Sequence, residues 1–118
     1  MTDWGRFLKA YEPDPKLKDD AASLRACQLA VEGAGLGTYG VGALLLDEDG
    51  NIIVQGHNEV YVRGFRSDLH AEMVVLNRFE GKGKGLEDRH RYTMVTSLEP
   101  CPMCMTRIIF AGIGTILY

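Results

Sequence analysis

The sequence predicts an α/β domain in which helices cover the faces of a central sheet. Helical and strand patterns alternate along most of the chain, which is typical of this class. One predicted strand, residues 41–46, is apolar at almost every position, as expected for a strand buried on both faces. The chain has 118 residues, enough for one hydrophobic core but not for two. The predicted order is helix, helix, strand, strand, helix, strand, helix, strand.

Residues 1–16 are predicted to form an N-terminal helical extension. Large apolar side chains recur there with the spacing of one helix face, and prolines follow within residues 12–16, where they end the helix. The apolar positions of this face are Trp4, Phe7, Leu8 and Tyr11.

A second helix is predicted from an apolar stripe that continues into the glycine-rich segment 32–40, where the helix should stop. The stripe is expected to face the core, and the cysteine within it is interpreted as a packing residue. Its members are Leu17, Ala21, Leu24, Cys27 and Val31.

The remaining elements follow from turn residues and apolar runs. Two apolar runs flank the dipeptide Asp49–Gly50, which predicts a β-hairpin. A loop then precedes a helix over residues 70–80, and a polar loop containing "GKGKG" follows that helix. The last three elements are a strand at 92–97, a helix at about 102–111, and a strand that begins near residue 114.

Composition narrows the classes of function. The net charge of −3 argues against a protein dominated by nucleic-acid binding, which usually has a basic face. No apolar run approaches the about 20 residues that span a bilayer, and the N-terminus lacks the apolar segment of a signal peptide. A cytoplasmic protein is therefore expected. In a reducing compartment, a C-x-x-C pair indicates metal or redox chemistry more than a disulfide.

Three residues predict a metal site. Cys101 and Cys104 lie three positions apart at the start of a predicted helix, so their sulfur atoms should approach one point. A helix N-terminus also favours the thiolate form that binds metals. His70 opens the other predicted helix and offers a neutral nitrogen. One nitrogen and two sulfur ligands suit Zn²⁺, and three protein ligands leave a fourth position open, as in catalytic zinc sites.

Glu72 lies two residues after His70, near enough to exchange protons with a water at that open position. Taken singly, each feature has a simpler interpretation: a redox dithiol, a surface histidine, or a glutamate that complements a helix dipole. The combination of H-x-E with P-C-x-x-C favours a catalytic zinc site.

The segments "HAE" (70–72) and "EPCPMC" (99–104) resemble the zinc-dependent cytidine and deoxycytidylate deaminase superfamily, and "GHN" (56–58) resembles its cytosine, guanine and tRNA-adenosine deaminase branch. The resemblance implies a three-layer α-β-α fold with a mixed sheet, of which the C-terminal part is absent from this chain, and a homo-oligomer. It also implies site roles: zinc ligands His70, Cys101 and Cys104, proton shuttle Glu72, and substrate contacts at Asn58 and the backbone of Ala71.

The leading functional hypothesis is hydrolytic deamination of a free nucleobase or small analogue of the cytosine or guanine type. A tRNA adenosine deaminase is the first alternative, and the acidic net charge counts against it. A non-catalytic module held by structural zinc is the second, and it requires a fourth ligand. Residues of the loop before the 70–80 helix either line the pocket entrance or only anchor the loop: Tyr61, Arg63, Phe65 and Arg66. The spare candidates for a fourth ligand are Cys27, His57 and His90.

Overall fold

The computed structural model of the chain describes residues 3–118. The predicted order of helices and strands is confirmed, with a short 3₁₀ helix added inside the predicted polar loop. Residues 1 and 2 of the predicted N-terminal extension lie outside the described residues. The elements are α1 (Asp3–Ala10), α2 (Asp20–Gly35), β1 (Gly42–Leu46), β2 (Ile52–His57), α3 (Ala71–Gly81), η1 (Arg89–Arg91), β3 (Thr93–Thr96), α4 (Pro102–Phe110) and β4 (Thr115–Leu117).

The four strands form one mixed sheet with the order β2-β1-β3-β4. Strand β1 pairs antiparallel with both β2 and β3, and β3 pairs parallel with β4. The predicted hairpin joins β1 to β2. Its turn is held by the carboxylate of Asp47, which accepts hydrogen bonds from the backbone N–H groups of Asp49 and Asn51. Gly50 supplies the positive φ of 84° that the turn needs.

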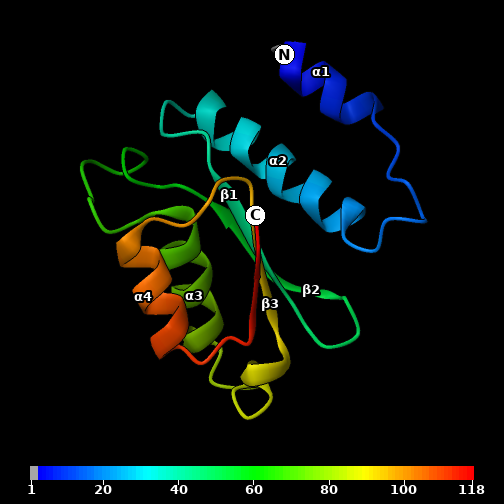
Figure 1. Cartoon of the computed structure of the whole chain (residues 1–118). Coiled ribbons are helices and arrows are strands. Elements are labelled where there is room, and N and C mark those ends of the chain that lie inside the picture. The colour runs from blue at the N-terminus through cyan, green and yellow to red at the C-terminus, as the bar shows by residue number, and fades with distance from the viewer. Residues whose placement is uncertain (1–2) are drawn as a thin grey trace.

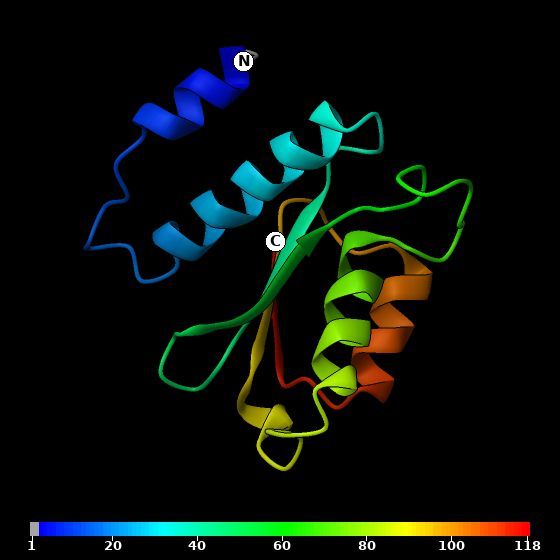
Figure 2. The same ribbon diagram turned by 180° about the vertical axis from the view of Figure 1, so that it is seen from behind.

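The sheet separates two hydrophobic clusters, so the predicted three-layer arrangement is confirmed (Figures 1 and 2). Helix α2 covers one face, and α3 and α4 lie together on the other. All five residues of β1 are buried because alternate side chains enter alternate clusters. Ala43 and Leu45 join the α3–α4 side, whereas Leu44 and Leu46 join the α2 side. No helix in residues 3–118 has the length and apolar character needed to cross a membrane.

The predicted stripe on the second helix was wrong about which face is buried. Ala26, Leu29 and Gly33 are the buried residues of α2, whereas Leu17 is exposed and precedes the helix. Cys27 is only half-buried and belongs to neither core cluster. The aliphatic residues at helical spacing suggested the stripe, but the close approach of α2 to β1 at Gly42 turns Ala26 and Leu29 toward the strand instead. The helix also extends to Gly35, further into the glycine-rich segment than predicted.

Gly42→Ala is expected to destabilise the protein by about 3 kcal/mol or more, because the new methyl group would meet α2. A Cβ at Gly42 would overlap the carbonyl oxygen of Ala26 and would lie 2.6 Å from Leu29 Cβ and 2.7 Å from Ala30 N. Denaturant unfolding measures the change. Gly35→Ala is the matched control, since a Cβ there has no atom within 4 Å. Equal stability of the two variants would show that α2 does not pack this closely on β1.

Helix α1 rests on the outer side of α2. Gln28 Nε2 of α2 donates to the carbonyl oxygen of Leu8 at 3.4 Å. The other apolar residues of its predicted face stay largely in solvent, where neighbouring rings contact one another: Trp4 with Phe7, and Phe7 with Tyr11. The short helix is confirmed, but its aromatic face adds little to the core.

Candidate metal centre and adjoining pocket

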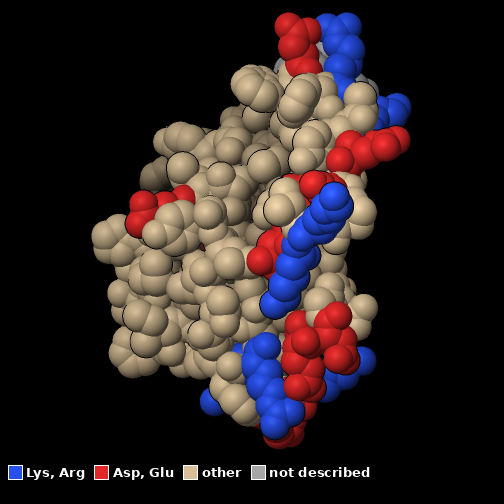
Figure 3. All heavy atoms as spheres, turned by 45° about the vertical axis from the view of Figure 1, so that its right-hand side comes forward, with Lys and Arg blue, Asp and Glu red and all other residues tan. Residues whose placement is uncertain are grey.

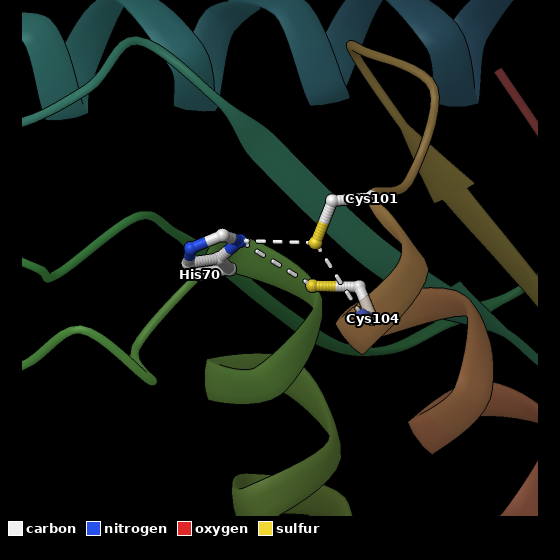
Figure 4. A group of neighbouring side chains, drawn as sticks. All are labelled: His70, Cys101 and Cys104. Carbon is white, nitrogen blue, oxygen red and sulfur yellow. Dashed lines mark hydrogen bonds between the residues drawn. The ribbon is translucent and has the colours of Figure 1, made fainter.

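The N-termini of α3 and α4 meet on one side of the sheet and bring three potential metal ligands together (Figure 4). His70 is the N-cap residue of α3, and Cys101 is the N-cap residue of α4. Pro102 occupies the start of α4, where its missing N–H group costs no hydrogen bond. The sulfur of Cys101 accepts a hydrogen bond from the backbone N–H of Cys104, which fixes both cysteines in the first turn.

The spacing of the three ligand atoms fits a tetrahedral zinc site. Nδ1 of His70 lies 3.5 Å from Sγ of Cys101 and 3.5 Å from Sγ of Cys104. With zinc–sulfur bonds of about 2.3 Å and zinc–nitrogen bonds of about 2.0 Å, a tetrahedron has nitrogen–sulfur edges of about 3.5 Å. All three ligand atoms lie within 4.8 Å of one another. The side chains are therefore already arranged for the metal that their chemistry prefers.

The metal-free site would hold the Cys104 sulfur as a thiol. Burial raises the pKa of Cys104 well above its usual range, and the neighbouring Glu72 carboxylate and Cys101 thiol raise it further. A bound cation reverses this balance, because it stabilises thiolates directly. Metal binding is therefore coupled to loss of the Cys104 thiol proton.

A pocket of about 380 Å³ opens beside the ligands. Two of the metal-site residues, His70 and Cys101, border it, and so does Glu72, whose side chain is only 3% exposed. Ala71 and Asn58 also line this pocket. The structure thus brings Glu72, Asn58 and Ala71 together around one cavity that two of the three potential metal ligands also border.

Asn58, which follows the end of β2, and its neighbour His57 have different surroundings. Asn58 lines the pocket, whereas His57 packs against α2, near the position that a Cβ of Gly33 would occupy. In the described residues, the metal-ligand cluster consists of His70, Cys101 and Cys104 alone. None of the spare candidates for a fourth ligand joins it, and His90 is exposed in η1.

None of the four loop residues suggested for the entrance is in the wall of the pocket. Tyr61 contacts Tyr39, a pocket residue, with ring centroids 5.7 Å apart, and Phe65 contacts Tyr61 at 5.6 Å. Arg66 is occupied by an ion pair with Asp68. The rings of Tyr61 and Phe65 are therefore connected to the pocket wall through Tyr39.

Sequence reasoning missed several wall residues. They come from the segment before β1 and from the loop after β3, and although Glu99 opens the quoted "EPCPMC" segment, no role was assigned to it. The segment after β3 leads directly into Cys101, whereas the segment before β1 reaches the metal ligands through the pairing of β1 with β3. The missed wall residues are Tyr39, Val41, Leu98 and Glu99.

Residues 17–118 match the model of the cytidine and deoxycytidylate deaminase zinc-binding region. The chain belongs to this deaminase family. Zinc is accordingly the cofactor of this deaminase domain, and His70, Cys101 and Cys104 are positioned to hold it. Zinc in such a site acts as a Lewis acid that activates water near neutral pH.

Similar proteins include several kinds of deaminase. Over 94 residues the deaminase domain is 33% identical to guanine deaminase of Bacillus subtilis, covering 80% of this chain and 59% of that protein. It is 30% identical to tRNA-specific adenosine deaminase of Haemophilus influenzae, covering 85% of this chain and 57% of that protein. The X-ray structure of the Bacillus enzyme superposes with a TM-score of 0.67 at 34% identity, over 81% of this chain and 60% of that one.

A third relative is a larger protein. The deaminase domain is 38% identical over 98 residues to tRNA(Ile)-lysidine synthase of Deinococcus radiodurans, covering 83% of this chain but 16% of that protein. The chain thus spans less than two thirds of the length of each of these three relatives.

Proposed function

We propose that this deaminase domain hydrolyses an exocyclic amine from a nucleobase or a small base analogue of the cytosine or guanine type. The observation that carries the proposal is the buried carboxylate of Glu72 in a pocket bordered by a three-ligand zinc site. A carboxylate excluded from bulk water and placed beside the metal is suited to proton transfer rather than to binding the metal itself.

The proposed reaction assigns each step of proton transfer to Glu72. Its carboxylate takes a proton from the attacking water while the water oxygen bonds to the ring carbon that carries the amine. The same group returns that proton to the adjacent ring nitrogen. It then takes the second proton of the former water from the newly attached hydroxyl and delivers it to the amine, as the ring carbon becomes a carbonyl. The carbon–nitrogen bond breaks, and ammonia leaves. Asn58 and the backbone of Ala71 contact the ring and hold it in place.

A panel assay tests this function. The zinc-loaded protein is incubated with bases, nucleosides and pterins, and released ammonia is measured. We expect turnover of at least one oxo-bearing aminopyrimidine or aminopurine, and loss of that turnover when zinc is removed by a chelator. Complete inactivity of the fully zinc-loaded chain toward all panel members would contradict the proposal.

Deamination of a base within tRNA is a second candidate, favoured by the rings beside the pocket. Tyr39, Tyr61 and Phe65 are each at least half exposed and form a continuous series at its mouth, which suits stacking of neighbouring bases. The net charge of −3 counts against it. On the face shown in Figure 3, acidic and basic side chains are interspersed along one side, without a continuous basic surface. A tRNA anticodon stem-loop added to the panel separates the candidates.

We infer that residues 1–118 form one deaminase domain, with residues 1–16 as its N-terminal helical extension. Free thiols at a zinc site suit a reducing compartment such as the cytoplasm.

The side chains of Ile109 and Phe110 at the end of α4 are largely exposed, which supports assembly of a homo-oligomer. A purely structural zinc is disfavoured because the described residues supply only three ligands.

A further inference from the structure

The side chain of Asn58 is held in one orientation by two hydrogen bonds. Its Oδ1 accepts from the backbone N–H of Val60 at 2.9 Å and from the hydroxyl of Thr38 at 2.6 Å. A backbone N–H can only donate, so the amide atom that faces it must be the oxygen. The nitrogen Nδ2 therefore lies on the other branch of the amide.

Thr38 has its own orientation fixed. The backbone N–H of Tyr61 donates to Thr38 Oγ1 at 3.3 Å, so the hydroxyl proton of Thr38 is directed to Asn58. Both side chains are nearly inaccessible, with 9% exposure for Thr38 and 3% for Asn58. Because Thr38 is 20 residues from Asn58 and 23 from Tyr61 in the sequence, the arrangement forms only in the folded protein.

Nδ2 of Asn58 is left as a donor for the pocket. Within residues 3–118, no protein group accepts a hydrogen bond from it, although Asn58 borders the pocket. In the same residues, every fully buried side-chain nitrogen or oxygen has a hydrogen-bond partner. Because Asn58 Nδ2 has none, it is not fully buried and is reached by solvent. A buried amide with one satisfied side and one open side is suited to recognise a ligand atom.

We propose that Thr38 is a positioning residue that orients the Asn58 amide so that Nδ2 donates to an oxo group of the substrate ring. This inference rests on the proposed function and narrows it: the pocket selects amino-heterocycles that carry a hydrogen-bond acceptor beside the amidine. Without the Thr38 hydroxyl, Oδ1 keeps a single donor, and the amide turns more easily.

Thr38→Val keeps the shape of the side chain and removes the hydroxyl. We expect KM for the best oxo-bearing substrate to rise about 5- to 10-fold, with kcat changed by less than about threefold, because the lost contact already exists in the bound ground state. Thr38→Ser should restore the wild-type KM. Thr93→Val is the matched control. Thr93 begins β3, whereas the pocket residues Leu98 and Glu99 follow the other end of that strand. The hydroxyl of Thr93 has no hydrogen-bond partner among the described residues.

Selectivity gives a readout that a purely structural role would not change. Cytosine is compared with 4-aminopyrimidine, or guanine with 2-aminopurine, since each second compound lacks the oxo group. In the wild type, we expect a preference for the oxo-bearing compound. In Thr38→Val, that preference should fall about 5-fold or more. An equal loss for both members of a pair would overturn the proposal.

A third readout does not require turnover. In ¹H–¹⁵N spectra of the zinc-loaded protein, the Asn58 side-chain NH₂ signals, assigned by their absence in Asn58→Asp, should shift in Thr38→Val and return in Thr38→Ser. Unchanged signals in Thr38→Val would also refute the inference. If those signals behave as expected while no base is deaminated, the proposed function fails and the positioning role of Thr38 stands.

Discussion

Glu72→Gln is expected to lower kcat by about 10³-fold while zinc remains bound. Glutamine has nearly the same volume and fits the buried position at the start of α3, where the glutamate is 3% exposed. Its amide cannot accept and return a proton near neutral pH, so the main loss is that of general acid–base catalysis, worth about 10²- to 10⁴-fold. Glu72→Ala should lose as much or more, because it also leaves a space in the pocket.

Zinc content and ammonia release are measured on the same preparation. The matched control is Glu99→Gln, which alters an exposed glutamate in the wall of the same pocket. We expect Glu99→Gln to retain activity within about threefold, since a solvated carboxylate at the rim has no assigned proton to transfer. Near-normal ammonia release from Glu72→Gln would remove Glu72 from the mechanism. Loss of zinc from that variant would instead assign Glu72 to the metal.

The metal site could be predicted from sequence because its residues are defined by local geometry. Cys101 and Cys104 occupy the first turn of one helix, where a spacing of three already fixes the relation between the two sulfurs. His70 and Glu72 are likewise fixed by the start of α3. The only long-range event is the meeting of two helix N-termini, and the ligand chemistry of zinc requires it.

The remainder of the pocket depends on contacts that no local pattern encodes. Thr38 and Asn58 are twenty residues apart and join only because β1 and β2 form a hairpin. Likewise, the buried face of α2 follows from its close approach to Gly42, which places Ala26 and Leu29 against the sheet instead of the predicted stripe. Periodicity identifies a helix, but its partner decides which face is buried.

Cys104→Ser is expected to abolish tight zinc binding and, with it, activity. Cys104 is fully buried, and its sulfur lies 3.5 Å from His70 Nδ1, so no other side chain of the described residues can take its place. Zinc that binds only the folded state adds about 2.7 kcal/mol of stability at a free concentration 100 times its dissociation constant. The wild type should therefore gain thermal stability when zinc is added, and Cys104→Ser should gain almost none.

Metal content per chain and thermal unfolding with zinc or chelator provide the measurements, and Cys27→Ser is the control. Cys27 is a half-buried free cysteine on α2, across the sheet from the metal ligands, so its variant should keep both zinc and the zinc-dependent rise in stability. Full zinc occupancy in Cys104→Ser would show that the ligand set is wrong. Cys104→Ser and Glu72→Gln together separate metal binding from proton transfer. Cys104→Ser should lose turnover because it loses the metal, whereas Glu72→Gln should lose turnover while the metal stays bound. Only a site in which Glu72 moves protons beside a zinc it does not hold gives both results.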